Sequence, residues 1–113
     1  MEFKRLFTRQ EAESTLPLVR QIVADVLETA RKIRELGKDH DDFPRLQSEL
    51  EENMLELESM GCFYKDWSFT VGLVDFPAVI DGKTVFLCWR SDEEHLAWYH
   101  SVDEGFAGRK ALP

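Results

Sequence analysis

The feature that most constrains the fold is an Asp81-Gly82 dipeptide between two runs of largely apolar residues. Asp-Gly favours the left-handed backbone conformations of a two-residue hairpin turn. The flanking runs, residues 71–80 and 83–90, are therefore predicted to be antiparallel strands joined by that turn. A turn this short also fixes the register, and one face of the paired strands is then almost wholly apolar. That face is predicted to pack on the core.

The first half of the chain has a helical period instead. A capping box that starts at Thr8 begins a helical stretch, and apolar residues recur at steps of three and four up to Gly37. Pro17 is predicted to interrupt this stretch, because proline lacks the N–H that an interior helical hydrogen bond needs. A second helix is predicted from Asp42 to Gly61. Since the connecting loop is short, the two helices should fold back as an antiparallel hairpin.

A third strand is predicted over residues 96–100, beside the second strand of the hairpin. If the loop before it closes Arg90 onto His95, then His100 faces the core and Tyr99 faces the opposite side. The glycine-rich tail that follows is predicted to be irregular.

These patterns predict an α+β fold, in which an antiparallel helical hairpin packs on a small antiparallel sheet of about three strands. Residues 1–113 are expected to form a single domain, with the hairpin at about 8–60 and the sheet and tail at about 62–113. Hydrophobic residues make up 43% of the chain and charged residues 32%, which is typical of a globular protein. No apolar run is long enough to span a bilayer, and no export signal is recognised. A cytoplasmic location with two reduced cysteines is therefore expected.

Several short motifs are linked along the chain. They are residues 72–78 (GLVDFPA), 87–90 (LCWR) and 105–109 (GFAGR), His100, and amino-terminal Phe7-Thr8, Glu11-Ala12 and Leu16-Pro17. On these residues the chain resembles a bacterial family catalogued only as domain of unknown function 2203. The resemblance covers essentially the whole chain, with Tyr99 at a position where the family has tryptophan. It implies a small stand-alone bacterial protein, and it supplies no activity.

The most informative polar group lies on the outer face of the predicted sheet. The hairpin register sets Asp75 across from Cys88, with Arg90 one diagonal step away, so Arg90 is predicted to hold Asp75 through charge-assisted hydrogen bonds. Together with Tyr99 and His95, these residues form a candidate ligand-binding pocket. The alternative is a structural ion pair beside an apolar thiol. A catalytic thiol needs a base within reach, and no catalytic residue is predicted.

Side chains of metal-ligating type gather near the third strand, namely His95, His100, Asp103, Glu104 and Cys88. However, His95 and His100 are five residues apart, so in a continuous strand they point to opposite faces. No metal site and no cofactor are therefore predicted, and His100 is expected to be a hydrogen-bonded core histidine.

Arg109 in the glycine-rich tail is a candidate anion-binding residue, because successive backbone N–H groups in such a loop form a nest for anions. The alternative is that Arg109 pairs with one of the many acidic side chains.

The charge balance restricts the partners. The formal net charge is −8, which disfavours nucleic acid and anionic membranes, and a protein partner with a basic surface fits better.

The helices, at about 30 Å, are longer than the sheet is wide. Leu16, Leu18 and Leu55 fall outside the main apolar stripes. Apolar helix surface is therefore expected to stay uncovered in a monomer, which favours a homodimer through the hairpins.

Two functions are compatible with the sequence. The first is a non-catalytic protein-interaction or assembly module, homodimeric through its helical hairpin, and it is favoured because no catalytic set is recognised. The second is a small-molecule- or metal-binding protein, or an enzyme, that uses the outer face of the sheet. The two differ in which surface of the molecule is used.

Overall fold

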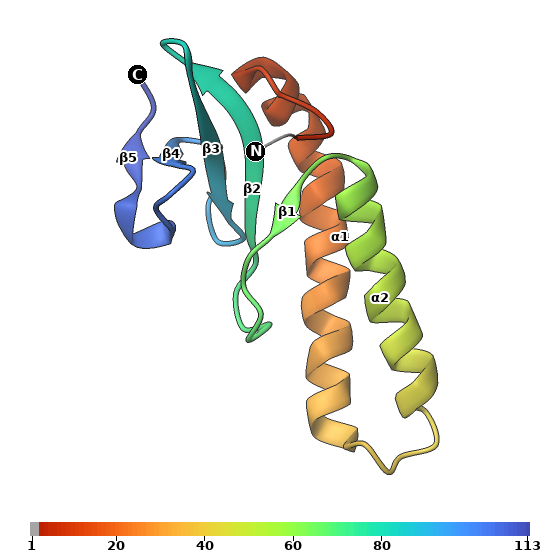
Figure 1. The fold of residues 1–113 in the computed structure, drawn as a ribbon. Helices are drawn as coiled ribbons and strands as arrows, with labels where there is room; N and C mark the ends of the chain where they lie inside the picture. Colours follow the sequence, from red (N-terminus) through yellow and green to blue (C-terminus); the bar gives the residue numbers. More distant parts are fainter. Residues whose placement is uncertain (1–2) are drawn as a thin grey trace.

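The computed structural model describes residues 3–113 and shows a helical hairpin beside an antiparallel sheet (Figure 1). The hairpin consists of α1 (Arg9–Leu36) and α2 (Phe43–Ser59). The sheet has the order β1-β2-β3-β4-β5, in which every neighbouring pair is antiparallel. Its strands are β1 (Phe63–Tyr64), β2 (Leu73–Ile80), β3 (Lys83–Arg90), β4 (Trp98–Ser101) and β5 (Lys110–Ala111), and a 3₁₀ turn, η1 (Phe106–Gly108), precedes the last one.

The α+β class is confirmed, but the sheet has five strands where about three were expected. The two additional strands, β1 and β5, are only two residues long. A pair of residues is too short to display a period of two, so no sequence pattern could reveal them. The tail that was predicted to be irregular contains η1 and β5.

The start of α1 is as predicted. The Thr8 side chain accepts a hydrogen bond from the Glu11 N–H at 3.0 Å, and the Glu11 carboxylate accepts one from the Thr8 N–H at 2.9 Å. This reciprocal capping box satisfies two backbone donors that a helix end otherwise leaves without partners.

The predicted interruption at Pro17 is wrong, because α1 runs through it. Leu16 and Val19 on either side of it are buried at 3% and 0% exposure. Leu16 therefore belongs to the apolar stripe from which it was excluded. Burying this stripe on both sides of Pro17 outweighs the one lost hydrogen bond. The first turns lie at an angle to the rest of the helix (Figure 1), as is usual near a proline.

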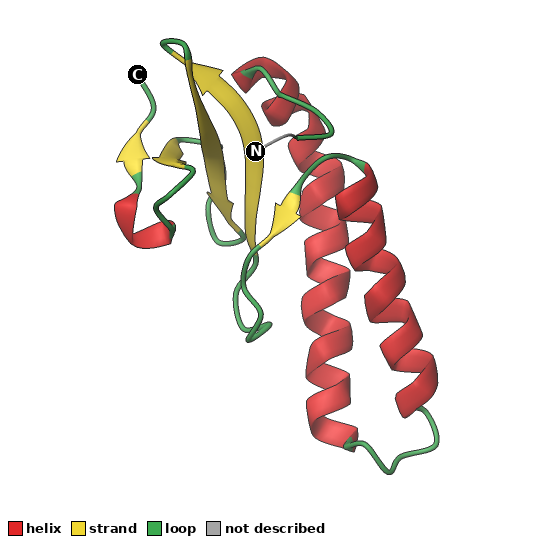
Figure 2. Cartoon of the chain, viewed as in Figure 1, coloured by secondary structure: helices red, strands yellow, loops and turns green. Residues whose placement is uncertain are grey.

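The helix ends also follow the predictions. Gly37 ends α1 and Gly61 follows α2, both with positive φ, and Pro44 lies in the first turn of α2. The hairpin extends well beyond the sheet (Figure 2), so the molecule measures 51 × 25 × 24 Å. Within residues 3–113, neither helix has the length and hydrophobicity that a bilayer crossing requires.

The Asp81-Gly82 turn is a two-residue turn, with φ of 51° and 76°. It pairs all eight residues of β2 with β3 in the predicted register. The inner face of this hairpin packs on α1 and is apolar. Its buried members are Val74, Phe76, Ala78, Val85, Leu87 and Trp89. The layers approach closely at Gly72, where an added Cβ would lie 2.2 Å from a methyl group of Val23.

Candidate functional site

The position of β4 decides which side chains share the outer face of the sheet. β4 pairs Phe86 with His100 and Cys88 with Trp98, which is one residue away from the register that closes Arg90 onto His95. Because side chains alternate along a strand, this shift moves the whole strand to the other face. The predicted placement of His100 in the core and Tyr99 on the outer face is therefore wrong.

The loop before β4 explains the shift. The Trp89 indole N–H donates to the Glu93 carbonyl at 3.0 Å, and the Glu93 carboxylate accepts from the Arg90 N–H at 2.7 Å. Leu96 is fully buried in the core, and its N–H donates to Glu13 on α1 at 2.9 Å. These contacts hold residues 91–97 against the first turns of α1. The loop is therefore longer than predicted, and β4 begins at Trp98 instead of residue 96.

The shift brings three side chains of different chemistry together. Asp75 on β2, Cys88 on β3 and His100 on β4 are 2%, 2% and 3% exposed. One carboxylate oxygen, the sulfur and one ring nitrogen all lie within 4.8 Å of one another. Since each residue comes from a different, hydrogen-bonded strand, the sheet backbone holds the trio in place.

Both ring nitrogens of His100 have partners. Nδ1 lies 2.8 Å from the Ser101 carbonyl oxygen. A carbonyl can only accept, so Nδ1 carries a hydrogen. Nε2 lies 3.1 Å from Oδ1 of Asp75, and a proton or a cation must lie between these two atoms. The hydrogen bond to Asp75 raises the pKa of His100 above its usual value, although burial acts in the opposite direction.

The Cys88 thiol is protonated in the metal-free protein at neutral pH. Burial, followed by the negative charge of Asp75, raises its pKa to about 12. A thiol with so high a pKa is a poor nucleophile. His100 is also already engaged through both nitrogens. The arrangement therefore does not match a cysteine–histidine nucleophile and base.

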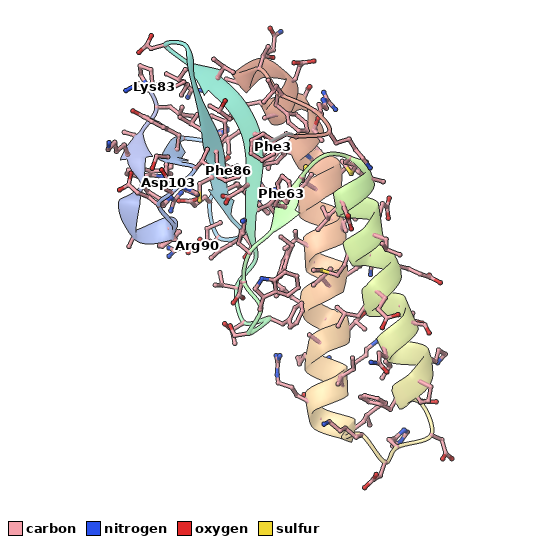
Figure 3. The ribbon with its side chains drawn as sticks, in the orientation of Figure 1. Phe3, Phe63, Lys83, Phe86, Arg90 and Asp103 are labelled. Carbon is pink, nitrogen blue, oxygen red and sulfur yellow. The ribbon has the colours of Figure 1, made fainter. Side chains whose placement is uncertain are left out.

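A pocket of about 280 Å³ opens onto the trio. Besides Asp75, its charged lining residues are Lys65 and Glu104, and the Lys65 ammonium lies 5.2 Å from the centre of the Phe86 ring. The Phe86 ring in turn contacts the rings of Phe3 and Phe63, with 5.4 and 5.9 Å between ring centroids. Figure 3 shows these three rings together beside β2. The remaining lining residues are Leu73, Val102, Gly105 and Phe106.

Of the predicted ligand-binding residues, the structure brings together Asp75 and Cys88 and leaves the other three outside. The predicted Arg90–Asp75 pair is absent, because Arg90 lies near the end of β3 (Figure 3) and binds Asp92 at 2.6 and 2.8 Å. Tyr99 packs against the core on the inner face. His95 is exposed in the loop before β4.

Arg109 has an acidic partner, Glu93, whose carboxylate oxygens both lie 2.7 Å from one guanidinium nitrogen. The same nitrogen donates to the Cys88 carbonyl at 3.3 Å. Arg109 thus ties the tail to the sheet behind Cys88. Anion binding by Arg109 stays a prediction.

His100 is the site residue that sequence reasoning placed wrongly. It was considered as a metal ligand and rejected because it was compared with His95 instead of Asp75 and Cys88. The available signal was its place among the linked motifs, since residues 72–78, residues 87–90 and His100 each contribute one member of the trio. Glu104, another ligand type, lines the pocket, whereas Asp103 is not part of its lining.

Comparisons with known proteins identify a family and no function. No curated protein and no solved structure matches the chain. The model of a family described as uncharacterized conserved protein (DUF2203) matches residues 5–112. The match covers nearly the whole chain, including all three members of the trio. The chain therefore belongs to the DUF2203 family.

Proposed function

We propose that the protein binds a divalent transition-metal ion of the zinc class through Asp75, Cys88 and His100. The observation that carries the proposal is the convergence of a carboxylate oxygen, a sulfur and an imidazole nitrogen within 4.8 Å of one another. In a tetrahedral zinc site with bonds of 2.0–2.3 Å, neighbouring ligand atoms are about 3.3 to 3.8 Å apart. The trio reaches that geometry with shifts of about an ångström.

The hydrogen bonds of His100 support this assignment. A metal-binding histidine normally donates its other ring N–H to a carbonyl or carboxylate, which fixes the ring and its tautomer. The Ser101 carbonyl has this role for Nδ1. Nε2 is thereby directed at Asp75, and a metal ion between the two takes the place of the proton that they share in the metal-free protein.

The ligand set also defines the kind of site. Thiolate and imidazole favour zinc and similar ions over magnesium or calcium. With zinc bound, the charges of Asp75, the Cys88 thiolate and the metal add to zero, which lowers the cost of burying them. Three protein ligands leave a fourth position for water or a small molecule. The pocket lined by Lys65 and Glu104 opens onto the trio, so it would give such a molecule access to a bound ion.

Calorimetric titration of chelator-treated protein with Zn²⁺ tests the proposal, and the chain provides a matched control. Cys62 is as buried as Cys88, and burial raises its pKa to about 12 as well, but it lies outside the trio. Cys88→Ser should weaken zinc binding by about 100-fold or more, because even changes in residues behind the ligands cost 10- to 100-fold. Cys62→Ser should bind zinc like the wild type. Equal binding by Cys88→Ser would refute the proposal.

A second candidate function is the protein-interaction module expected from the helix patterning. It is favoured by two large apolar side chains, Leu55 on α2 of the hairpin and Trp67 in the loop after β1, which are 62% and 67% exposed. The homodimer expected from the sequence is one form of this function. Light scattering on the purified protein at micromolar concentration tests the homodimer: a mass twice that of the 13.2 kDa chain supports it, and the mass of a single chain contradicts the homodimer but not an interaction with a different protein.

A further inference from the structure

An apolar groove runs along α2, beside the loop that joins β1 to β2. Its volume is about 470 Å³, and its lining is Leu50, Glu51, Met54, Leu55, Glu58, Trp67 and Phe69. We propose that this α2 groove docks a basic amphipathic helix of another protein. The inference deepens the second candidate function by naming the surface and the partner's chemistry, and it does not depend on the metal site.

The most exposed apolar side chains of the groove are well placed to anchor a partner. Trp67 contacts Tyr64 and Phe69 edge to face, at 6.1 and 6.2 Å between ring centroids. One edge of its ring is thus supported while 67% of the residue remains exposed. Tryptophan is one of the residues enriched at the energetic hot spots of interfaces, where a partner buries the ring.

The loop that presents Trp67 is ordered by Asp66. Its carboxylate accepts hydrogen bonds from the backbone N–H groups of Ser68, Thr70 and Val71 at 2.7 to 3.2 Å. Phe69 has a φ of 55°, which is unfavourable for a residue with a bulky side chain. The loop therefore maintains a strained conformation that keeps an apolar ring in water, and such strain is concentrated at functional sites.

The charges around the groove define the partner. α2 contains five glutamates and one arginine, and that arginine, Arg45, is paired with Asp42 and Glu49. Within residues 3–113, Glu51 and Glu58 at the groove have no basic side chain within salt-bridge distance. An apolar strip bordered by unneutralised acids matches a helix with apolar residues on one side and lysines or arginines beside them.

The length of the groove fits a helix. From Leu50 to Glu58, α2 rises by about 12 Å, which corresponds to roughly two turns of a docked helix. Two turns place anchors at positions i, i+3 or i+4, and i+7. A second copy of this chain fits less well, because its net charge of −8 would place like charges against the acidic border.

Fluorescence anisotropy with a labelled peptide tests the proposal on the full chain. The probe is a helical peptide of about 18 residues, with leucines at every third or fourth position and lysines elsewhere, since shorter helices are marginal in water. Its controls are a scrambled peptide of equal charge and a version with glutamate in place of lysine. The leucine–lysine helix should bind, and both controls should bind about tenfold more weakly or worse.

Protein variants then separate the groove from general attraction to an acidic surface. Trp67→Ala and Leu55→Ser should each weaken binding by about tenfold without changing the net charge. Leu18→Ser is the matched control, because Leu18 is 49% exposed on α1 and outside the groove. Equal affinity of all three variants would overturn the proposal. So would a wild-type dimer that Trp67→Ala converts to a monomer, because a second copy would then occupy the groove. Unchanged zinc binding by Trp67→Ala would show that the metal proposal is unaffected.

Discussion

Both faces of the β2–β3 hairpin contain buried residues, but the two faces differ in chemistry. On the inner face, Phe76 and Trp89 are fully buried against other apolar side chains. On the outer face, Asp75 and Cys88 are 2% exposed beside His100. Neighbouring residues in the sequence thus serve opposite purposes. Burying apolar area stabilises the fold, whereas burying a carboxylate costs free energy unless a partner compensates it. The apolar inner face maintains the structure, and the buried polar groups of the outer face are the basis of the proposal that this face holds a metal ion.

The largest expected loss of stability comes from a substitution on the inner face. Phe76→Ala should lower the free energy of unfolding by about 3 to 5 kcal/mol, because it leaves a cavity in the core. Cys88→Ala on the outer face should cost about 1 kcal/mol in metal-free protein, which is near the value of one buried methylene group. Urea unfolding followed by circular dichroism measures both. If the two variants were equally unstable, the outer face would also be structural and the contrast would fail.

The two faces also differ in how far the sequence predicts them. The inner face depends only on the Asp81-Gly82 turn, whose residues specify the backbone conformation that the turn needs. The outer face additionally depends on β4, and the loop before β4 is set by contacts of Glu93 and Leu96 that no local pattern encodes. An error of one residue in the predicted register of β4 placed His100 on the inner face and Tyr99 on the outer face, the reverse of what the structure shows. The capping box at Thr8 could be predicted because it is local, whereas Pro17 in α1 could not, because burial on the sheet decided the outcome.

An intermediate effect is expected for the Asp75–His100 pair. In metal-free protein at about pH 6, Asp75→Asn should lower the free energy of unfolding by about 1.5 to 3 kcal/mol, the range for a hydrogen bond to a charged group. The hydrogen bond raises the pKa of His100 above 6.5 in the folded state. The stabilisation is therefore fully present below that pH and is lost as the pH rises through the raised pKa.

Urea unfolding of wild type and Asp75→Asn with a chelator present measures this dependence. The difference in stability between the two proteins should be larger at about pH 6 than at about pH 9. A difference that grew with pH would show that the imidazolium is not stabilised by Asp75.

The smallest expected loss of stability comes from the Asp81-Gly82 turn, which fixes the register of β2 and β3 and so the residues on each face. Gly82→Ala should cost about 1 kcal/mol, because an L-residue is disfavoured at a φ of 76°. Gly105→Ala is the control, since φ there is −103° and an added Cβ meets nothing within 4 Å. It should change thermal stability by less than about 0.5 kcal/mol. Equal effects of the two changes would mean that the conformation of the turn is not what fixes the register.

The most direct test of the metal site is a crystal structure of zinc-loaded protein, with an anomalous difference map calculated at the zinc edge. We expect one strong peak at about 2.3 Å from the Cys88 sulfur, about 2.0 Å from Nε2 of His100 and about 2.1 Å from an Asp75 oxygen. Peaks confined to exposed carboxylates, with Nε2 of His100 still bound directly to Asp75, would contradict the account.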